Sequence, residues 1–327
     1  MKALVCRELG APEKLVIDSH WPEPELKAGQ VIIDVKAGSL NFPDLLLMQG
    51  KYQFQKQLPY VVGSECSGVV SAVAADVSEF QIGDCVVAVG PSAAFCERIV
   101  VESSSVFPMP DSFSFQQSAG ICMAYFTAYH ALRQKARLQS GETLLVLGAA
   151  GGVGSAALDI GRQMGAKVIA ATSTEEKLQL AREMGADHTI NYTEQSIKDA
   201  VNDLTDGKGV DVVYDPVGGK FSELALRCMA WNGRFLVVGF ANGVIPRLPL
   251  NLVLLKNCEI TGVSWGDFSK HQPEDYRQNI NELWMLFNQG KLRPIVVDSF
   301  PLADYQLAYK CLSERRARGK VILNIAH

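Results

Sequence analysis

The stretch TLLVLGAAGGVGSAALDIGRQMGAKVIAATSTEEK, residues 143–177, decides the fold of this chain. It opens with a short apolar run over residues 143–147, which predicts a strand buried on both faces. A glycine-rich turn follows, and apolar residues then recur at helical spacing until Gly165, where the helix is expected to end. A second strand is expected over residues 167–171. Strand, turn, helix and strand in this order predict a right-handed βαβ unit, which requires a parallel sheet.

The turn between the strand and the helix carries the first functional signal. It reads Gly148-Ala149-Ala150-Gly151-Gly152-Val153-Gly154, so Ala149 replaces the first glycine of the G-x-G-x-x-G pattern. A side chain at Gly151 or Gly152 would hold a pyrophosphate away from the backbone, and Gly154 lets the helix lie close to the strand. The free N–H groups at a helix N-terminus bind phosphate. The position of this turn between a strand and a helix favours dinucleotide binding over a purely structural glycine turn.

The end of the second strand indicates which dinucleotide binds. An NAD-binding unit places Asp or Glu there to hold the ribose 2′-hydroxyl, whereas this chain has Ala170-Ala171-Thr172. NADP(H) is therefore favoured over NAD(H). Ser173 is expected to cap the next helix, with Glu176 closing a capping box. Lys177 is either an ordinary solvated helix lysine or a point charge that reaches a 2′-phosphate.

Composition narrows the class of protein. The 327 residues are 48% hydrophobic, which is enough for two domains with sizeable cores. The formal net charge of −4 argues against nucleic acid or an anionic membrane as the main partner. We expect no signal peptide and no membrane span, because no apolar run is long enough for either. The eight cysteines are scattered without a C-x-x-C pair, which predicts reduced thiols and a cytoplasmic location.

The chain divides into two predicted domains. Residues 1–122 contain short alternating or apolar runs separated by Gly, Pro and Asp, which predicts a mostly antiparallel, barrel-like β-domain. Residues 123–262 form the second predicted domain, which begins within a helical pattern over residues 118–138. Strands and helices then alternate, for example a helix at 197–204 and a strand at 210–215, and this alternation predicts a doubly wound parallel sheet. Residues 263–327 hold a helix at 276–288 and two strands that cannot bury themselves alone, so they are assigned to the first domain.

Motifs spread over nearly the whole chain resemble one known family. They include Asn41-Phe42-Pro43-Asp44, Gly50-Lys51-Tyr52, Gly63-Ser64-Glu65-Cys66-Ser67-Gly68, Asp215-Pro216-Val217-Gly218-Gly219 and Gly319-Lys320-Val321. Together they are similar to the zinc-free quinone oxidoreductase, or zeta-crystallin-like, branch of the medium-chain dehydrogenase/reductase superfamily. Leu254-Leu255-Lys256-Asn257 and Trp265-Gly266 resemble one subgroup of that branch. The resemblance implies an α/β fold: a GroES-like β-barrel-type catalytic domain (1–122 and 263–327) and a Rossmann NADP(H)-binding domain (123–262).

The expected absence of a metal rests on two positions. Zinc-dependent members of the superfamily carry Cys near position 41 and a G-H-E-x-x-G run, whereas this chain has Asn41 and Ser64 there. A catalytic zinc needs about three protein ligands, usually Cys, His or a carboxylate. The four-cysteine lobe that binds structural zinc is absent from the sequence too, so no metal is expected.

The resemblance also implies roles for individual residues. The pyrophosphate would lie against the turn, on Ala150, Gly151, Gly152, Val153 and Gly154. The 2′-phosphate would be held by Ser173, Lys177, Tyr192 and a further cation at Arg315, where Arg316 and Arg318 are alternatives. The nicotinamide would be flanked by Thr127, Phe240, Ser264 and Trp265.

Two residues are expected to face the substrate, Asn41 and Tyr52. Each has a structural alternative, because Asn41 can serve as a turn residue that satisfies local backbone and Tyr52 as a half-buried core aromatic. Asp44 is interpreted as a cap or turn acid rather than a proton donor.

Three functional hypotheses follow. The first is an NADPH-dependent reductase that passes hydride to a quinone or a similar activated acceptor. The second is a 2-alkenal or enoyl-thioester reductase on the same scaffold, and the third is a non-catalytic NADPH-binding structural or sensor protein. We also predict a homodimer, or a tetramer built from dimers, joined along an edge strand near residues 258–263.

Overall fold

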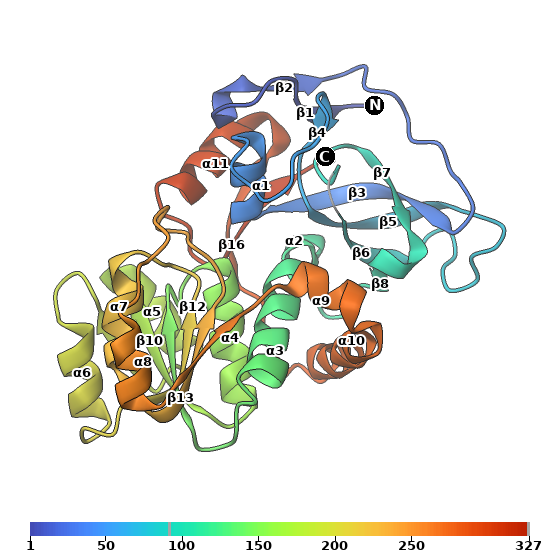
Figure 1. Cartoon of the computed structure of the whole chain (residues 1–327). Helices are drawn as coiled ribbons and strands as arrows, with labels where there is room; N and C mark the ends of the chain where they lie inside the picture. The colour runs from blue at the N-terminus through green and yellow to red at the C-terminus, as the bar shows by residue number, and fades with distance from the viewer. Residues whose placement is uncertain (91–92, 326–327) are drawn as a thin grey trace. The chain divides into compact units, whose positions relative to one another are not determined.

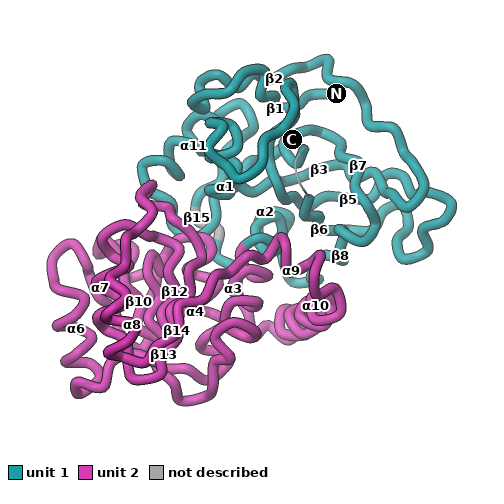
Figure 2. Tube along the Cα trace, in the orientation of Figure 1, with its two compact units in different colours: residues 1–123, 294–327 teal, residues 124–293 magenta. Residues whose placement is uncertain are grey.

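The computed structural model describes residues 1–90 and 93–325, which form two compact units (Figure 2). Unit 1 comprises residues 1–123 and 294–327, and unit 2 comprises residues 124–293. The first predicted boundary, after residue 122, lies next to the observed one. The second boundary differs from the prediction, because residues 263–293 belong to unit 2 rather than to the first domain.

Unit 2 is built on a parallel six-stranded sheet in the order β11-β10-β9-β12-β13-β14. The strands are β9 (Thr143–Leu147), β10 (Lys167–Thr172), β11 (His188–Asn191), β12 (Val210–Asp215), β13 (Met229–Val237) and β14 (Glu259–Gly262). The apolar residues 144–147 are fully buried, as predicted for a strand covered on both faces. Strand order reverses between β9 and β12, and doubly wound sheets bind ligands at such a switch point.

Helices alternate with these strands along the chain (Figure 1). They are α4 (Gly152–Gln163), α5 (Glu175–Glu183), α6 (Ile197–Leu204), α7 (Lys220–Arg227) and α8 (Leu250–Lys256). The limits of β9, β12 and α6 coincide with the predicted ones. The predicted cap of α5 is wrong: Thr174 has the extended backbone of an N-cap, and its Oγ1 accepts a 3.4 Å hydrogen bond from the Lys177 N–H.

Aromatic packing explains why residues 263–293 belong to unit 2. The predicted helix over 118–138 is divided into α2 (Phe115–Ala119), a π-helical turn over Cys122–Phe126, α3 (Thr127–His130) and a second π-helical turn over Ala131–Lys135. The Phe126 ring centroid lies 5.6 Å from that of Trp265 in α9 (Trp265–His271) and 5.8 Å from that of Trp284 in α10 (Pro273–Asn288). Such ring pairs stabilise the packing by more than the buried area alone. Because Phe126 belongs to unit 2, these contacts bury the aromatic side chains of α9 and α10 within that unit.

Unit 1 contains the predicted β-rich domain. Its larger sheet has the order β15-β16-β3-β5-β6-β8, with β7 paired to β3, and its smaller sheet has the order β2-β1-β4. The strands are β1 (Ala3–Cys6), β2 (Leu15–Asp18), β3 (Gln30–Leu40), β4 (Tyr60–Val61), β5 (Glu65–Val73), β6 (Cys85–Val89), β7 (Arg98–Glu102), β8 (Val106–Pro108), β15 (Val296–Pro301) and β16 (Lys320–Asn324). The last two strands join this domain as predicted, because β16 pairs with β3.

Short helices complete unit 1. They are α1 (Phe42–Met48), α2, α11 (Tyr305–Ser313) and 3₁₀ turns over Pro12–Lys14, Ser103–Ser105 and Leu302–Asp304. The strand β15 pairs in parallel with β16, whereas the remaining strand pairs of this unit are antiparallel. Within residues 1–90 and 93–325, no helix has both the length and the apolar character needed to cross a membrane.

Candidate cofactor and substrate site

The predicted site residues fall into both units. Asn41, Tyr52 and Arg315 lie in unit 1, and all the others lie in unit 2. The two sets are described separately, each within its own unit.

The glycine turn of unit 2 connects β9 to α4. Gly148 has the left-handed φ of 59°, which glycine adopts without strain. A Cβ at Gly154 would lie 2.2 Å from the Gly148 carbonyl oxygen, so only glycine fits where the helix approaches the turn. Gly151 is the N-cap of α4, and a Cβ there would lie 3.3 Å from the same oxygen. The turn therefore directs the free N–H groups of a twelve-residue helix toward the carboxyl end of the sheet.

The residues expected to hold a 2′-phosphate lie at the ends of two neighbouring strands. β10 and β11 are paired with Thr172 opposite Asn191, and the Tyr192 N–H donates a 3.0 Å hydrogen bond to the Thr172 carbonyl. Ser173 and Lys177 follow β10 and are half-buried, with Lys177 in the first turn of α5. The Tyr192 ring packs on Phe221 with centroids 4.4 Å apart. The structure thus brings Ser173, Lys177 and Tyr192 to the carboxyl ends of the neighbouring strands β10 and β11.

Arg315 is placed differently. It is exposed and has a left-handed φ of 57° directly after α11 in unit 1. Its two alternatives are engaged locally, because Arg316 pairs with Glu314 at 2.8 Å and Arg318 lies 3.9 Å from Asp298. The role of Arg315 in binding the cofactor stays a prediction.

The residues expected around the nicotinamide also follow strand ends. Phe240 comes after β13 and Ser264 after β14, and both strands end at the carboxyl edge that carries the glycine turn. Thr127 begins α3, next to the Phe126 ring that packs against Trp265. The Ser264 hydroxyl donates a 2.9 Å hydrogen bond to Asp267 at the start of α9.

Unit 1 contains a buried polar cluster that sequence reasoning had only partly identified. Register explains how it forms: Ser39 lies opposite Glu65, and Leu40 lies opposite Val321, so the residue after β3 meets the first residues of β5 and β16. Asn41, Glu65 and Lys320 are 6%, 1% and 5% exposed. In the sequence Lys320 stands in a motif that resembles the family, and its distance from Glu65 along the chain leaves no local signal for the contact.

Every polar atom of the Asn41 side chain is engaged within this cluster. Its Nδ2 donates to the Ser39 carbonyl at 3.3 Å and to Glu65 Oε1 at 2.9 Å, and its Oδ1 accepts from Lys320 Nζ at 2.6 Å. Lys320 Nζ also donates to Glu65 Oε1 at 2.8 Å, and the Met123 N–H donates to Glu65 Oε2 at 2.8 Å. These contacts anchor Asn41, and its predicted contact with substrate stays a prediction.

Asp44 forms a second part of the same cluster. Its Oδ2 accepts a 2.8 Å hydrogen bond from the Asn41 N–H, which confirms its expected role at the start of α1. Its Oδ1 accepts a hydrogen bond from the Ser64 hydroxyl. Burial raises the pKa of Asp44 from 3.8 to about 6, although the hydrogen bonds from Ser64 and Asn41 act in the opposite direction.

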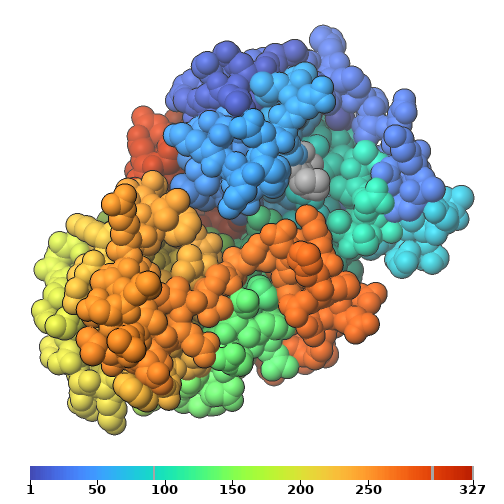
Figure 3. Space-filling model, viewed as in Figure 1, coloured from blue at the N-terminus to red at the C-terminus, as the bar shows by residue number. Residues whose placement is uncertain are grey.

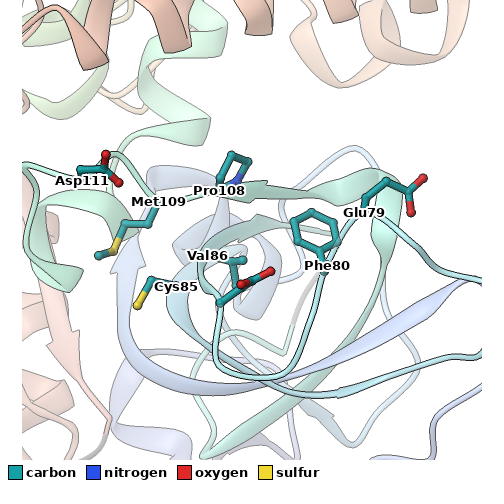
Figure 4. Close-up of a pocket in the computed structure, with 8 residues that line it drawn as sticks. Glu79, Phe80, Cys85, Val86, Pro108, Met109 and Asp111 are labelled. Atoms are coloured by element: carbon teal, nitrogen blue, oxygen red, sulfur yellow. The ribbon is translucent and has the colours of Figure 1, made fainter.

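Tyr52 and the surface depression of Figure 4 lie elsewhere in unit 1. Tyr52 is half-buried against the unit 1 core, with its ring edge-on to Phe54 at 5.1 Å, so its expected contact with substrate stays a prediction. The depression has a volume of about 430 Å³ and is lined by Glu79, Phe80, Asp84, Cys85, Val86, Pro108, Met109 and Asp111. None of the predicted site residues lines it.

Comparison with known proteins identifies the family. The alcohol dehydrogenase GroES-like domain family matches residues 27–140, and the zinc-binding dehydrogenase family matches residues 152–284. The quinone oxidoreductase-like protein 2 homolog of Nematostella vectensis is 41% identical over 326 residues, covering 99% of this chain and 88% of that protein. The chain belongs to the quinone oxidoreductase family. The subgroup indicated by residues 254–257 and 265–266 is therefore the quinone oxidoreductase-like protein 2 type.

Solved structures similar to this chain share its fold over nearly their whole length. Escherichia coli quinone oxidoreductase complexed with NADPH superposes with a TM-score of 0.91 at 29% identity, covering 99% of this chain and 100% of that chain. A 2-haloacrylate reductase superposes with a TM-score of 0.83 at 28% identity, covering 99% of each chain. Unit 1 is thus the GroES-like domain and unit 2 the Rossmann domain of a medium-chain dehydrogenase/reductase, and the chain is an oxidoreductase of that superfamily.

Proposed function

We propose that this family member is an NADPH-dependent oxidoreductase that passes hydride to a quinone or a similar activated acceptor without a metal ion. The proposal rests on the carboxyl end of the unit 2 sheet. There the glycine turn that follows β9 lies next to the end of β10, which carries no acidic residue. The NADPH complex of the Escherichia coli relative supports the choice of cofactor.

The residues of unit 2 fit such a cofactor. The N-terminus of α4 binds the pyrophosphate, and residues 150–154 leave the backbone accessible. The Lys177 ammonium and the Ser173 hydroxyl bind the 2′-phosphate, with the Tyr192 ring beside them. Thr127, Phe240, Ser264 and Trp265 orient the nicotinamide and exclude water from it. Bound NADPH supplies the hydride.

The residues of unit 1 do not fit a catalytic zinc ion. Asn41 and Ser64 replace the cysteine and histidine of the zinc-dependent relatives, and the side-chain oxygen of Asn41 accepts from the Lys320 ammonium. A divalent cation beside that ammonium would be repelled by it. Among the described residues, no group of three His, Cys, Asp or Glu side chains is arranged to hold a metal.

The acceptor must therefore take hydride without a Lewis acid. A quinone and an α,β-unsaturated carbonyl both spread the arriving charge onto oxygen, so positioning and a hydrogen-bond donor are sufficient. The names of relatives similar to this chain favour a quinone. The similarity to a 2-haloacrylate reductase favours reduction of an activated C=C bond as the second candidate.

A substrate panel tests the proposal. NADPH and NADH oxidation would be followed by the loss of the absorbance of the reduced nicotinamide, with 1,4-benzoquinone, 9,10-phenanthrenequinone, an alkenal and an enoyl-CoA. Quinone turnover with preference for NADPH is expected. Turnover on the alkenal or enoyl-CoA alone would replace the quinone by the second candidate. Tight NADPH binding without turnover would indicate a structural or sensor protein.

We also propose that two copies pair along β14. This strand ends the sheet of unit 2, so one of its edges has no partner strand among the described residues. The neighbouring α8 exposes Leu250, Leu254 and Leu255 at 73%, 79% and 68%, on the orange surface around residue 250 in Figure 3. A hollow of about 500 Å³ between α8 and β14 is lined in part by Leu254 and Cys258. An identical edge related by a two-fold axis covers both features.

The cysteines favour a reducing compartment. All eight are free thiols, and seven of them are buried. We propose a cytoplasmic location on this ground, which oxidation-state labelling of the native protein in its cells would check.

A further inference from the structure

The strand β12 of unit 2 ends in a buried carboxylate that holds the loop following it. Asp215 is 3% exposed, and its Oδ1 accepts hydrogen bonds from the Val217 and Gly218 N–H groups at 2.8 and 2.9 Å. The buried Ser222 hydroxyl in the first turn of α7 donates to its Oδ2 at 2.5 Å. All three donors are uncharged, and burial of the carboxylate is compensated only while each of them stays directed at it.

Residues 216–219, which we call the β12 loop, need such a support. Gly218 and Gly219 have left-handed φ angles of 74° and 62°, which glycine adopts without strain. Consecutive left-handed residues belong to no helix or strand whose ladder of hydrogen bonds could hold them. An aspartate that accepts from the backbone two and three residues further on closes a turn of this kind. Asp215 therefore fixes the path of the β12 loop.

A second loop, residues 238–244 after β13, is fastened to the β12 loop through backbone hydrogen bonds. The Asn242 N–H donates to the Val217 carbonyl at 2.7 Å. In the opposite direction, the Gly219 N–H donates to the Val244 carbonyl at 2.9 Å. Because these bonds run both ways between the loops, the carboxylate that fixes the first loop also fixes the second.

The two loops adjoin the predicted cofactor site at two points. The Val217 side chain lies against the glycine turn, since a Cβ at Gly148 would lie 2.9 Å from Val217 Cγ2. The Phe240 ring lies against the β12 loop, since a Cβ at Gly218 would lie 3.0 Å from Phe240 Cδ1. Phe240 is the ring expected beside the nicotinamide.

The strand order indicates which half of the dinucleotide these loops receive. The turn after β9 is placed for the pyrophosphate, and the ends of β10 and β11 are placed for the adenosine half with its 2′-phosphate. The other mononucleotide half then lies across the switch point, over the ends of β12 and β13. The loops that Asp215 fixes follow those two strands.

We propose that Asp215 is a positioning residue for the nicotinamide half of NADPH, an inference that rests on the proposed function. Its Oδ1 fixes the β12 loop, and the β12 loop fixes the place of the Phe240 ring. A displaced nicotinamide loses affinity and also transfers hydride more slowly, because the transfer needs a near-attack geometry. The adenosine half is bound at β10 and β11 and does not depend on Asp215.

The binding test compares NADPH with adenosine 2′,5′-bisphosphate, which lacks the nicotinamide half, on the full-length protein. Asp215→Leu keeps a side chain of similar size but accepts no hydrogen bond. It is expected to raise the Kd of NADPH about tenfold or more and to leave the Kd of the bisphosphate unchanged. The fluorescence of the bound nicotinamide is expected to shift toward that of free NADPH. Asp215→Asn keeps an acceptor oxygen for both N–H groups and is expected to recover most of the lost affinity.

Asp211→Leu is the matched control. Asp211 lies at the other end of β12, where its Oδ2 accepts a 2.8 Å hydrogen bond from the Thr143 N–H. Loss of this bond is expected to lower the Tm and to leave the Kd of NADPH unchanged. If Asp215→Leu does not fold, Asp215→Ser replaces it, because a serine hydroxyl closes the same turn more weakly. A rise in the Kd of NADPH alone is again expected.

Two results would overturn the inference and leave the proposed cofactor standing: equal rises in Kd for both ligands, or an unchanged Kd of NADPH in Asp215→Leu. A wild type that binds neither ligand would instead refute the proposed cofactor, and the role of Asp215 with it. On an acceptor that the wild type reduces, kcat at saturating NADPH is expected to fall about 100-fold in Asp215→Leu and to recover in Asp215→Asn.

Discussion

The buried ion pair of unit 1 gives the sharpest stability prediction. Lys320→Met keeps an unbranched side chain of similar length in the same place but removes the ammonium. Glu65 is 1% exposed and would keep only the Asn41 amide and the Met123 N–H as donors. The Asn41 Oδ1 would lose the donor now 2.6 Å away. Removing one partner of a buried pair costs about 3–5 kcal/mol, because the other charge stays buried without compensation.

A matched control separates this cost from the general effect of losing a lysine. Lys310 and Glu314 form an exposed pair at 3.7 Å within unit 1. Exposed pairs contribute about 0–1 kcal/mol, so Lys310→Met is expected to leave the free energy of unfolding almost unchanged. The double variant Lys320→Met with Glu65→Gln removes both charges and is expected to recover about 1–3 kcal/mol of the loss.

The assay is urea unfolding followed by circular dichroism, with hydrogen exchange of peptides from β3, β5 and β16 to locate the loss in unit 1. Faster exchange confined to those strands is expected for Lys320→Met. Equal unfolding free energies for Lys320→Met and Lys310→Met would refute the reasoning. An additive double variant would show that Lys320 and Glu65 do not interact.

The remaining predictions concern the cofactor, the turn, the dimer and pH. Lys177→Ala should raise the KM for NADPH about tenfold or more and leave the KM for NADH unchanged. Equal effects on both would contradict the proposal that Lys177 binds the 2′-phosphate. Gly154→Ala, whose Cβ would lie 2.2 Å from a backbone oxygen, should cost about 1–3 kcal/mol, whereas Gly151→Ala should weaken NADPH binding with little loss of Tm. Leu254→Glu should convert the proposed dimer to a monomer in sedimentation velocity, and a monomeric wild type would contradict the proposed interface. The pKa of Asp44 is raised from 3.8 to about 6, so the folded state binds its proton more tightly than the unfolded state does. The free energy of unfolding should therefore fall by about 3 kcal/mol as the pH rises from below 4 through 6. Asp44→Asn should abolish this part of the pH dependence.

The sequence alone was sufficient for the regular core of unit 2. The limits of β9, α6 and β12 could be predicted from patterns within a few residues. Burial of a strand on both faces leaves a short apolar run, and burial of one helical face leaves apolar residues at helical spacing. Capping was less certain, because Ser173 and Thr174 are both good N-caps by residue type, and it is the Thr174 side chain that accepts the hydrogen bond from the Lys177 N–H.

The second domain boundary needed the tertiary structure. The sequence predicted only the helix over 276–288 in this region, and nothing local shows which unit residues 265–288 pack on. Rings far apart in sequence decide it, since Phe126 packs against Trp265 and Trp284. The two π-helical turns beside α3 likewise have no sequence signal that we could read.

The glycine spacing and the absence of an acidic residue after β10 are by themselves enough to predict where a dinucleotide binds, because backbone access and charge are local properties of short motifs. The buried charges of unit 1 are different. Lys320 and Glu65 are 255 residues apart, and only the pairing of β16 and β5 on either side of β3 brings them together. Likewise, Asp44 reads in sequence as a helix cap, and its raised pKa follows from its burial and from the groups that the folded sheet brings around it.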